Sequence, residues 1–303
     1  MAYKSSRRVD LAAVATAPFA AFQWRLLLLW LVLLLLPVAV AALPLMQALG
    51  GLIDHSTHVH DWARQFDAMM FGDVLQALGQ QHATLHGALM GSLMLAVLLL
   101  PWLNGMVVAS GRSGRTLGFG SLLQGGLLEY GRMFRLLLWS LLPYAAAFEL
   151  VQLCLDKADD RSDLATLESQ AMFVQHMAWW LSGLAIVIAQ AWVESARAAF
   201  IADGGLRSAT LAMLRGLMQL LRRPFSTLLS YLLITVIGFA IALVLGLARA
   251  HTLAVGVHGL LLSFLLSQLV VVTLGWTRIA RLFALADVAR SLGGPSRRSG
   301  LNG

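Results

Sequence analysis

Long apolar runs constrain this sequence more than any other feature. About 20 consecutive apolar residues in a helix cross the roughly 30 Å hydrocarbon core of a bilayer, and such runs recur along a chain of 303 residues. Hydrophobic residues make up 59% of the chain and charged residues only 12%, whereas a soluble domain carries about 25% charged residues. The sequence therefore predicts an all-α protein: a polytopic membrane helical bundle with six transmembrane helices in three hairpins, forming a single integral membrane domain over residues 1–303.

The predicted spans are separated by segments of very different character. They cover about residues 24–44, 87–108, 135–155, 177–198, 225–247 and 258–279. Residues 45–86 form a polar outer loop with one or two amphipathic helices at the membrane surface. Interfacial helices are expected at 122–134 and 206–221, and the last helix should continue into a cytoplasmic tail (280–303) until Gly293-Gly294-Pro295 ends it.

The first span also has features of a secretory signal. Basic residues precede Leu26–Leu36, and Ala39-Val40-Ala41 has the small residues of a cleavage site. The apolar run exceeds the about 7 to 15 residues of a signal core, so we expect an uncleaved anchor.

Basic residues are distributed very unequally between the two sides of the predicted membrane. Six spans place the N-terminus, the second and fourth loops and the C-terminal tail on one side, and these segments hold 18 of the 22 basic residues. The opposite side holds Arg64, Lys157, Arg161 and Arg249. By the positive-inside rule, both termini are expected to be cytoplasmic. The basic groups lie at span ends, where arginine pairs with lipid phosphate, so nucleic acid is not the expected partner.

A string of interfacial residues occurs twice. W-x4-R-x3-[IL]-A-D begins at Trp192 and returns 84 positions later at Trp276. The segment after its first copy, from Gly205 to Tyr231, matches Gly118 to Tyr144, 87 positions earlier, with Arg222 at the position of Arg135. The last two hairpins are therefore interpreted as a tandem parallel repeat, and the first third as a weaker third copy.

The repeated residues suit the headgroup region on the inner side of the membrane. Tryptophan prefers the headgroup level and arginine one turn on reaches phosphate. Spacing predicts ion pairs of Asp203 with Arg207, of Asp287 with Arg290, and of Glu194 with Arg197. Membrane anchoring explains these residues without a ligand, and the alternative is a lipid-headgroup or partner site built from Arg197 and Arg281. The predicted lipid or partner interface comprises Arg135, Trp192, Arg197, Asp203, Arg222, Trp276, Arg281 and Asp287.

Small and polar residues inside the spans predict helix packing. Gly87 and Gly91 stand at small-xxx-small spacing, as do Gly238, Ala242 and Gly246, and such surfaces let a second helix approach closely. Asn104, Gln190 and Gln268 are among the few polar groups within spans. Interhelical hydrogen bonding is the favoured role for the two glutamines, and a substrate site is the alternative.

The polar outer loop holds the one group of residues with metal-ligand chemistry. His55, His58 and His60 could bind zinc or copper, because imidazoles three residues apart can share a helix face. A solvated segment with incidental histidines is the favoured interpretation, and a pH-sensing role is also open. The chain contains no H-E-x-x-H, G-x-S-x-G, Walker A or CxxC pattern. We therefore expect neither an enzyme nor a cofactor.

Several short motifs resemble a known group of proteins. They are Gly120-Ser121-Leu122-Leu123, the basic Arg135 before a span, Ile201-Ala202-Asp203 and Leu285-Ala286-Asp287. On these residues the chain resembles the YciC-like bacterial six-span inner-membrane proteins, which are related to the membrane domain of some glycerophosphodiester phosphodiesterases. The resemblance covers about residues 87–291, and it implies a fold and a bacterial inner membrane but no activity.

The leading functional prediction is a non-enzymatic integral inner-membrane protein. It would act as an envelope-assembly factor or as a subunit of a membrane complex, with anionic headgroups of the cytoplasmic leaflet and a membrane-protein partner or a second copy as its contacts. Two alternatives remain: a carrier for a lipid or amphipathic small solute, since some transporters are built from parallel repeats, and a metal-binding or pH-sensing protein acting at its periplasmic side.

Overall fold

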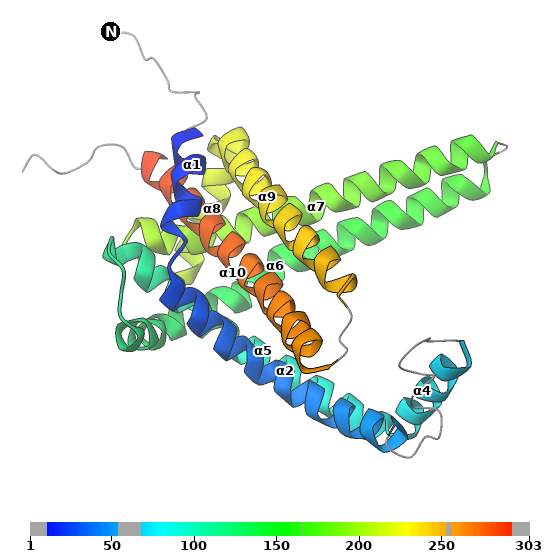
Figure 1. The fold of residues 1–303 in the computed structure, drawn as a ribbon. Coiled ribbons are helices and arrows are strands. Elements are labelled where there is room, and N and C mark those ends of the chain that lie inside the picture. The colour runs from blue at the N-terminus through cyan, green and yellow to red at the C-terminus, as the bar shows by residue number, and fades with distance from the viewer. Residues whose placement is uncertain (1–10, 54–67, 166, 253–255, 293–303) are drawn as a thin grey trace, which may run out of the picture. The chain divides into compact units, whose positions relative to one another are not determined.

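The computed structural model describes residues 11–53, 68–165, 167–252 and 256–292. Within these ranges the regular secondary structure is helical, without strands (Figure 1). The helices are α1 (Leu11–Ala20), α2 (Trp24–Ile53), α4 (Ala68–Gln80), α5 (His82–Ser113), α6 (Phe119–Asp163), α7 (Glu168–Ala202), α8 (Ala209–Arg222), α9 (Pro224–Ala250) and α10 (Gly256–Leu292).

Six of these helices are long and apolar enough to cross a membrane: α2, α5, α6, α7, α9 and α10. The predicted all-α fold with six spans is confirmed. Several helices extend beyond the predicted spans: α2 continues through Pro44 to Ile53 and α5 already begins at His82. Likewise, α6 continues to Asp163 and α7 begins at Glu168. Much of the described part of the predicted outer loop is therefore helix that extends the spans, together with the amphipathic α4.

The chain divides into two compact units, residues 28–100 and the remainder. In the smaller unit, the hydroxyl of Ser92 on α5 donates to the carbonyl of Pro37 on α2 over 2.7 Å. A Cβ on Gly91 would lie 3.9 Å from Val40, whereas one on Gly87 would meet nothing within 4 Å. Of the predicted glycine pair, Gly91 therefore faces the neighbouring helix and Gly87 has open space beside it.

The larger unit contains two long antiparallel helix pairs, α6 with α7 and α9 with α10 (Figure 1). Helix α6 runs for 45 residues without a break, so the interfacial helix feeds directly into its span, as predicted. Helix α8 is a separate surface helix, begun by Ser208, whose side chain accepts a hydrogen bond from the Leu211 amide. Pro224 stands in the first turn of α9, where its missing amide costs nothing.

The core of the larger unit lies toward one end of its helices. The last turns of α7 and the C-terminal part of α10 are almost entirely buried, including Phe200 and Leu282. In contrast, the middles of the spans expose large apolar side chains such as Val236, Phe239 and Leu265. Exposed apolar spans suit contact with lipid, and the buried end is where polar side chains can be held away from both lipid and water.

Candidate functional site at the arginine-rich end

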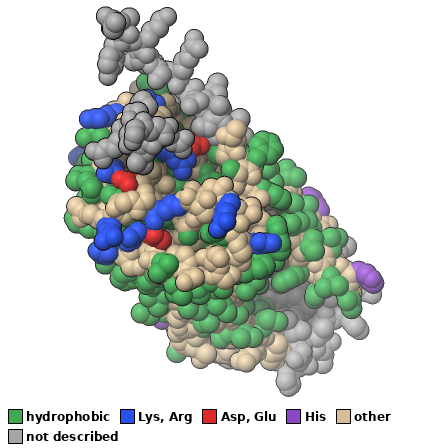
Figure 2. All heavy atoms as spheres, turned by 90° about the vertical axis from the view of Figure 1, so that its left-hand side faces the viewer, with side chains coloured by type: hydrophobic (Ala, Val, Ile, Leu, Met, Phe, Trp, Pro, Cys, Tyr) green, Lys and Arg blue, Asp and Glu red, His purple; other side chains and the backbone are tan. Residues whose placement is uncertain are grey.

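Segments that the charge distribution assigns to the inner side lie together in the larger unit. We call the last turns of α5, α7 and α10, the start of α6 and helix α8 the arginine-rich end. Arg112 Nε on α5 donates to the carbonyl of Phe200 on α7 over 2.7 Å, and Arg223 Nη1 donates to Ser291 Oγ on α10 over 2.7 Å. Figure 2 shows Lys and Arg side chains gathered on one face with few acidic side chains among them.

Tryptophans attach the surface helices to this end. The indole N–H of Trp192 donates to the carbonyl of Met213 on α8 over 2.9 Å, and that of Trp102 donates to Leu123 on α6 over 3.2 Å. Both acceptors lie 21 positions after their tryptophan. Trp276 donates to the carbonyl of Pro18 on α1 over 2.9 Å. Trp192 and Trp276 were predicted to face lipid headgroups, but they also join helices. Their partly buried indole N–H groups donate to carbonyl groups of the protein.

Close contacts at two glycines shift the alignment of the two surface helices. A Cβ on Gly126 would collide with Trp102, and one on Gly216 would lie 2.6 Å from the amide nitrogen of Ala196. The equivalent contacts thus pair Gly126 with Gly216, three positions away from the register suggested by matching the sequences. The N-caps of the two helices, Gly118 and Ser208, are also 90 positions apart.

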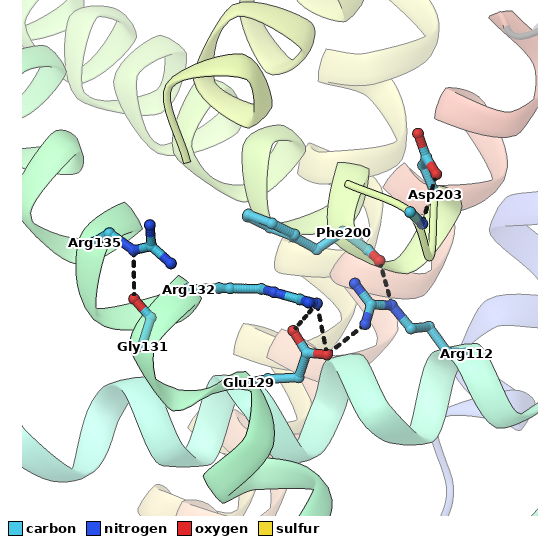
Figure 3. Close-up of polar contacts among 8 residues, drawn as sticks. Arg112, Glu129, Gly131, Arg132, Arg135, Phe200 and Asp203 are labelled. Atoms are coloured by element: carbon cyan, nitrogen blue, oxygen red, sulfur yellow. Dashed lines mark hydrogen bonds and ion pairs between the residues drawn. The ribbon is translucent and has the colours of Figure 1, made fainter. Parts of the chain in front are cut away.

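One carboxylate joins three helices at the arginine-rich end (Figure 3). Glu129 on α6, 8% exposed, accepts from Arg112 at 2.5 Å and from Arg132 at 3.0 Å, and Arg112 also holds the end of α7 through Phe200. No short motif singles out Glu129; the available signal is one acid among several arginines. Arg135 donates only to Gly131 in its own helix, at 3.1 Å, among the contacts shown.

A second buried carboxylate lies deeper, between α7 and α10. Glu194 Oε1 accepts from Arg281 Nη2 over 2.9 Å, with side-chain exposures of 3% and 16%. Arg281 also donates to Thr235 Oγ1 on α9 over 3.1 Å, and its guanidinium carbon lies 4.9 Å from the centre of the Tyr231 ring. The predicted pair of Glu194 with Arg197 is wrong, because tertiary packing brings a better placed guanidinium from α10.

Arg197 is left without a hydrogen-bonding or ion-pairing partner among the described residues. Its side chain belongs to the buried end of α7, and the residue is 7% exposed. The charge of Arg197 acts on Arg278 of α10, which also experiences the charges of Glu194 and Arg281. These four residues, Glu194, Arg197, Arg278 and Arg281, define the buried arginine cluster. It holds three guanidinium groups and one carboxylate.

The remaining predicted interface residues lie at the surface. Asp203 pairs with Arg215 on α8 at 2.6 Å and accepts from the Gly205 amide at 2.9 Å, so the predicted pair with Arg207 is wrong. The Arg215 hydrogen bond, followed by that of Gly205, lowers the pKa of the Asp203 carboxyl. Asp287 pairs with Arg290 at 2.6 Å, as predicted. Arg222 is exposed at the end of α8.

Polar and small residues inside the spans mostly join helices. The Tyr144 hydroxyl on α6 donates to Gln190 on α7 over 3.0 Å, which confirms the interhelical role of Gln190. A Cβ on Gly238 of α9 would collide with Thr277 of α10, and Ala242 is buried. A Cβ on Gly246, in contrast, would meet no atom within 4 Å. The predicted small-residue surface of α9 is therefore covered in part by α10 of the same chain.

A cavity of about 480 Å³ opens beside the arginine-rich end. It lies among α1, the end of α5 and the end of α10, and its lining includes Gln23, Arg115, Phe283, Asp287 and Arg290. Ser110 donates to Gln23 at its wall over 2.6 Å. The lining mixes aromatic, polar and basic groups, and its one carboxylate, Asp287, is already paired with Arg290.

Metal ligation is not found in the part of the chain that the structure describes, which contains no group of three or more His, Cys, Asp or Glu that could hold an ion. His55, His58 and His60 lie outside the described residues, so their predicted role stays a prediction. Compared with known proteins, the chain matches no family model, no curated protein and no solved structure.

Proposed function

We propose that this multi-pass membrane protein is a non-enzymatic component of the bacterial inner membrane, with both termini in the cytoplasm. It acts in envelope assembly or as a subunit of a larger membrane complex. Its arginine-rich end faces the anionic cytoplasmic leaflet and offers a cationic surface to a membrane-protein partner. We further propose that its hairpins are a tandem repeat, supported by the identical 21-residue spacing of the Trp102 and Trp192 hydrogen bonds.

One observation carries this proposal: the segments assigned to the inner side by their charge are joined to one another by direct contacts. Arg112 reaches the end of α7, and Arg223 reaches the end of α10. Basic groups that converge at one end of a helical unit create a positive field at the anionic inner leaflet. The described acids at this end, Glu129, Glu194, Asp203 and Asp287, are already paired with arginines.

Copurification tests the partner role. The wild-type chain and an Arg207→Gln/Arg222→Gln double variant would be crosslinked gently in membranes, solubilised and purified. Both side chains are exposed, and neither forms a hydrogen bond or ion pair with another described residue. We expect a defined partner with the wild type and its loss in the double variant. A wild-type chain that purifies alone after crosslinking would contradict the proposal.

A carrier for a lipid or amphipathic solute is the second candidate. The observation that favours it is the buried arginine cluster, because buried charge within a membrane helix often marks a ligand or ion pathway. Accelerated movement of a labelled lipid across vesicles that contain the purified protein would support a carrier, and movement no faster than in protein-free vesicles would count against one. Membership of the YciC-like group also remains a proposal.

A further inference from the structure

We propose that the buried arginine cluster binds a phosphate group. Arg197 and Arg281 provide the positive charge, and Glu194 positions Arg281. The ligand is either the phosphate of a lipid headgroup or a free phosphate. This inference does not depend on the partner role proposed above, because it concerns groups inside the helical unit rather than its cationic surface.

Charge balance is the first support for the site. Arginine stays protonated under all ordinary conditions, so burial cannot remove its charge. The single carboxylate of Glu194 is engaged by Arg281 at 2.9 Å. Arg197 has no ion-pairing partner among the described residues, so its positive charge is in excess of the Glu194–Arg281 pair. A buried excess charge is costly without a counter-ion, and an anion supplies what the described residues lack.

Unused hydrogen-bonding capacity is the second support. Arg197 is 7% exposed, and no described carboxylate or carbonyl accepts from its guanidinium. In addition, Arg281 Nε and Glu194 Oε2 are buried and have no hydrogen-bond partner among the described residues. Buried polar groups are normally satisfied, so unpartnered donors on both α7 and α10 indicate a missing acceptor.

The geometry favours phosphate over a single carboxylate. A guanidinium offers two parallel N–H groups that match two phosphate oxygens, and a phosphate monoester carries more negative charge than a carboxylate. Thr235 and Tyr231 fix Arg281 from the side of α9, so this arginine is already oriented. Arg197 stands five residues before α7 ends at Ala202, a rise of about 7.5 Å. That depth is within reach of a headgroup phosphate at the inner interface.

Binding to matched ligands tests the proposal. The wild type, Arg197→Gln and Arg161→Gln would be purified in uncharged detergent and stripped of lipid. Both variants lose one arginine, but Arg161 is exposed near the opposite end of α6, outside the predicted lipid interface. Each protein would be titrated with phosphatidic acid, with diacylglycerol as the same lipid without phosphate, and with inorganic phosphate, and binding would be followed by native mass spectrometry and melting temperature.

We expect wild type and Arg161→Gln to bind phosphatidic acid equally and diacylglycerol not at all. Arg197→Gln should bind phosphatidic acid roughly ten- to a hundredfold more weakly, the effect of losing a charge-assisted hydrogen-bond pair. Inorganic phosphate that binds the wild type and displaces the lipid would identify a free phosphate as the ligand source; binding of the lipid alone would identify a headgroup. Equal phosphatidic acid binding by wild type and Arg197→Gln, or none by the wild type, would overturn the site.

Melting temperatures measured with and without ligand test the site even if Arg197→Gln folds poorly. Without phosphate, Arg197→Met should melt at a higher temperature than the wild type, because it removes an unbalanced buried charge. Saturating ligand should raise the melting temperature of the wild type and leave that of Arg197→Met unchanged. If Arg197→Met is the less stable protein in phosphate-free detergent, the protein itself requires the charge of Arg197 and the proposal fails.

Discussion

Glu194 is the residue on which the balance of the buried arginine cluster depends. Changing Glu194→Gln leaves the guanidinium groups of Arg197 and Arg281 without this carboxylate, whereas Arg281→Gln reduces the excess charge although it breaks the same 2.9 Å pair. Removing one partner of a buried pair costs about 3–5 kcal/mol when the other charge is left uncompensated. We expect Glu194→Gln to approach this loss and Arg281→Gln to lose less, as measured by chemical unfolding in detergent. An equal or larger loss for Arg281→Gln would show that like-charge repulsion is not the governing interaction.

The surface ion pair of Asp203 with Arg215 should make the folding stability of the protein depend on pH. The pKa of Asp203 is lowered by Arg215, so the pair stabilises the fold above the unfolded carboxyl pKa of about 3.9. This stabilisation is lost as pH falls through the lower, folded pKa. Because the side chains are nearly half exposed, the contribution is at most about 1 kcal/mol. Arg215→Gln should therefore melt slightly below the wild type at neutral pH, and the gap should close in strong acid. A gap independent of pH would contradict the assignment.

Ion pairs within one helix could be predicted from the sequence, and those between helices could not. Asp287 and Arg290 are three residues apart on α10, and spacing alone brings them together. Glu194 had an equally well spaced candidate in Arg197, yet it pairs with Arg281, 87 positions away. Asp203 likewise prefers Arg215 on α8, because the turn before α8 folds that helix back over the carboxylate. Which of several arginines is nearest is a property of packing.

At the scale of elements, two glycines of one predicted packing surface have opposite environments. A Cβ on Gly238 would collide with the branched side chain of Thr277 on α10, whereas Gly246 has open space. We expect Gly238→Ala to destabilise the protein by about 1–3 kcal/mol through overpacking. Gly246→Ala should be neutral or stabilising by up to about 1 kcal/mol, because alanine favours a helix. Unfolding of the two variants side by side measures both effects, and equal outcomes would mean that α9 does not pack against α10 at Gly238.

The positions of the helices along the chain could be predicted from the sequence, but the hydrogen bonds that join one helix to another could not. Apolar length indicated all six spans, and the amphipathic pattern before Arg135 indicated the interfacial part of α6. The tryptophans were expected at the headgroups, since that preference is general. Their actual acceptors, the carbonyls of Leu123, Met213 and Pro18, become visible only when the surface helices are docked.

At the scale of the whole molecule, the distribution of basic residues along the sequence predicts which segments lie together in the fold. The loops that hold most of the arginines are far apart in sequence, yet contacts such as that of Arg112 with Phe200 bring them to one end of the larger unit. Hydrogen bonding of these ends explains why the core lies there rather than at mid-span, where leucine and phenylalanine face outward. The sequence does not predict that Arg197 lacks an ion-pairing partner among the described residues. It lacks one because Glu194 pairs with Arg281 instead.

Cysteine accessibility tests most directly whether the arginine-rich end faces the cytoplasm. Cys154 is the only cysteine, so Cys154→Ser gives a background without thiols. Into it would be introduced Arg115→Cys, Arg207→Cys or, at the opposite end, Asp160→Cys, all at exposed positions. A membrane-impermeant maleimide should label the Asp160→Cys chain in intact spheroplasts and the other two only after lysis. Labelling of Arg115→Cys or Arg207→Cys before lysis would contradict the orientation and the inner-leaflet role that rests on it.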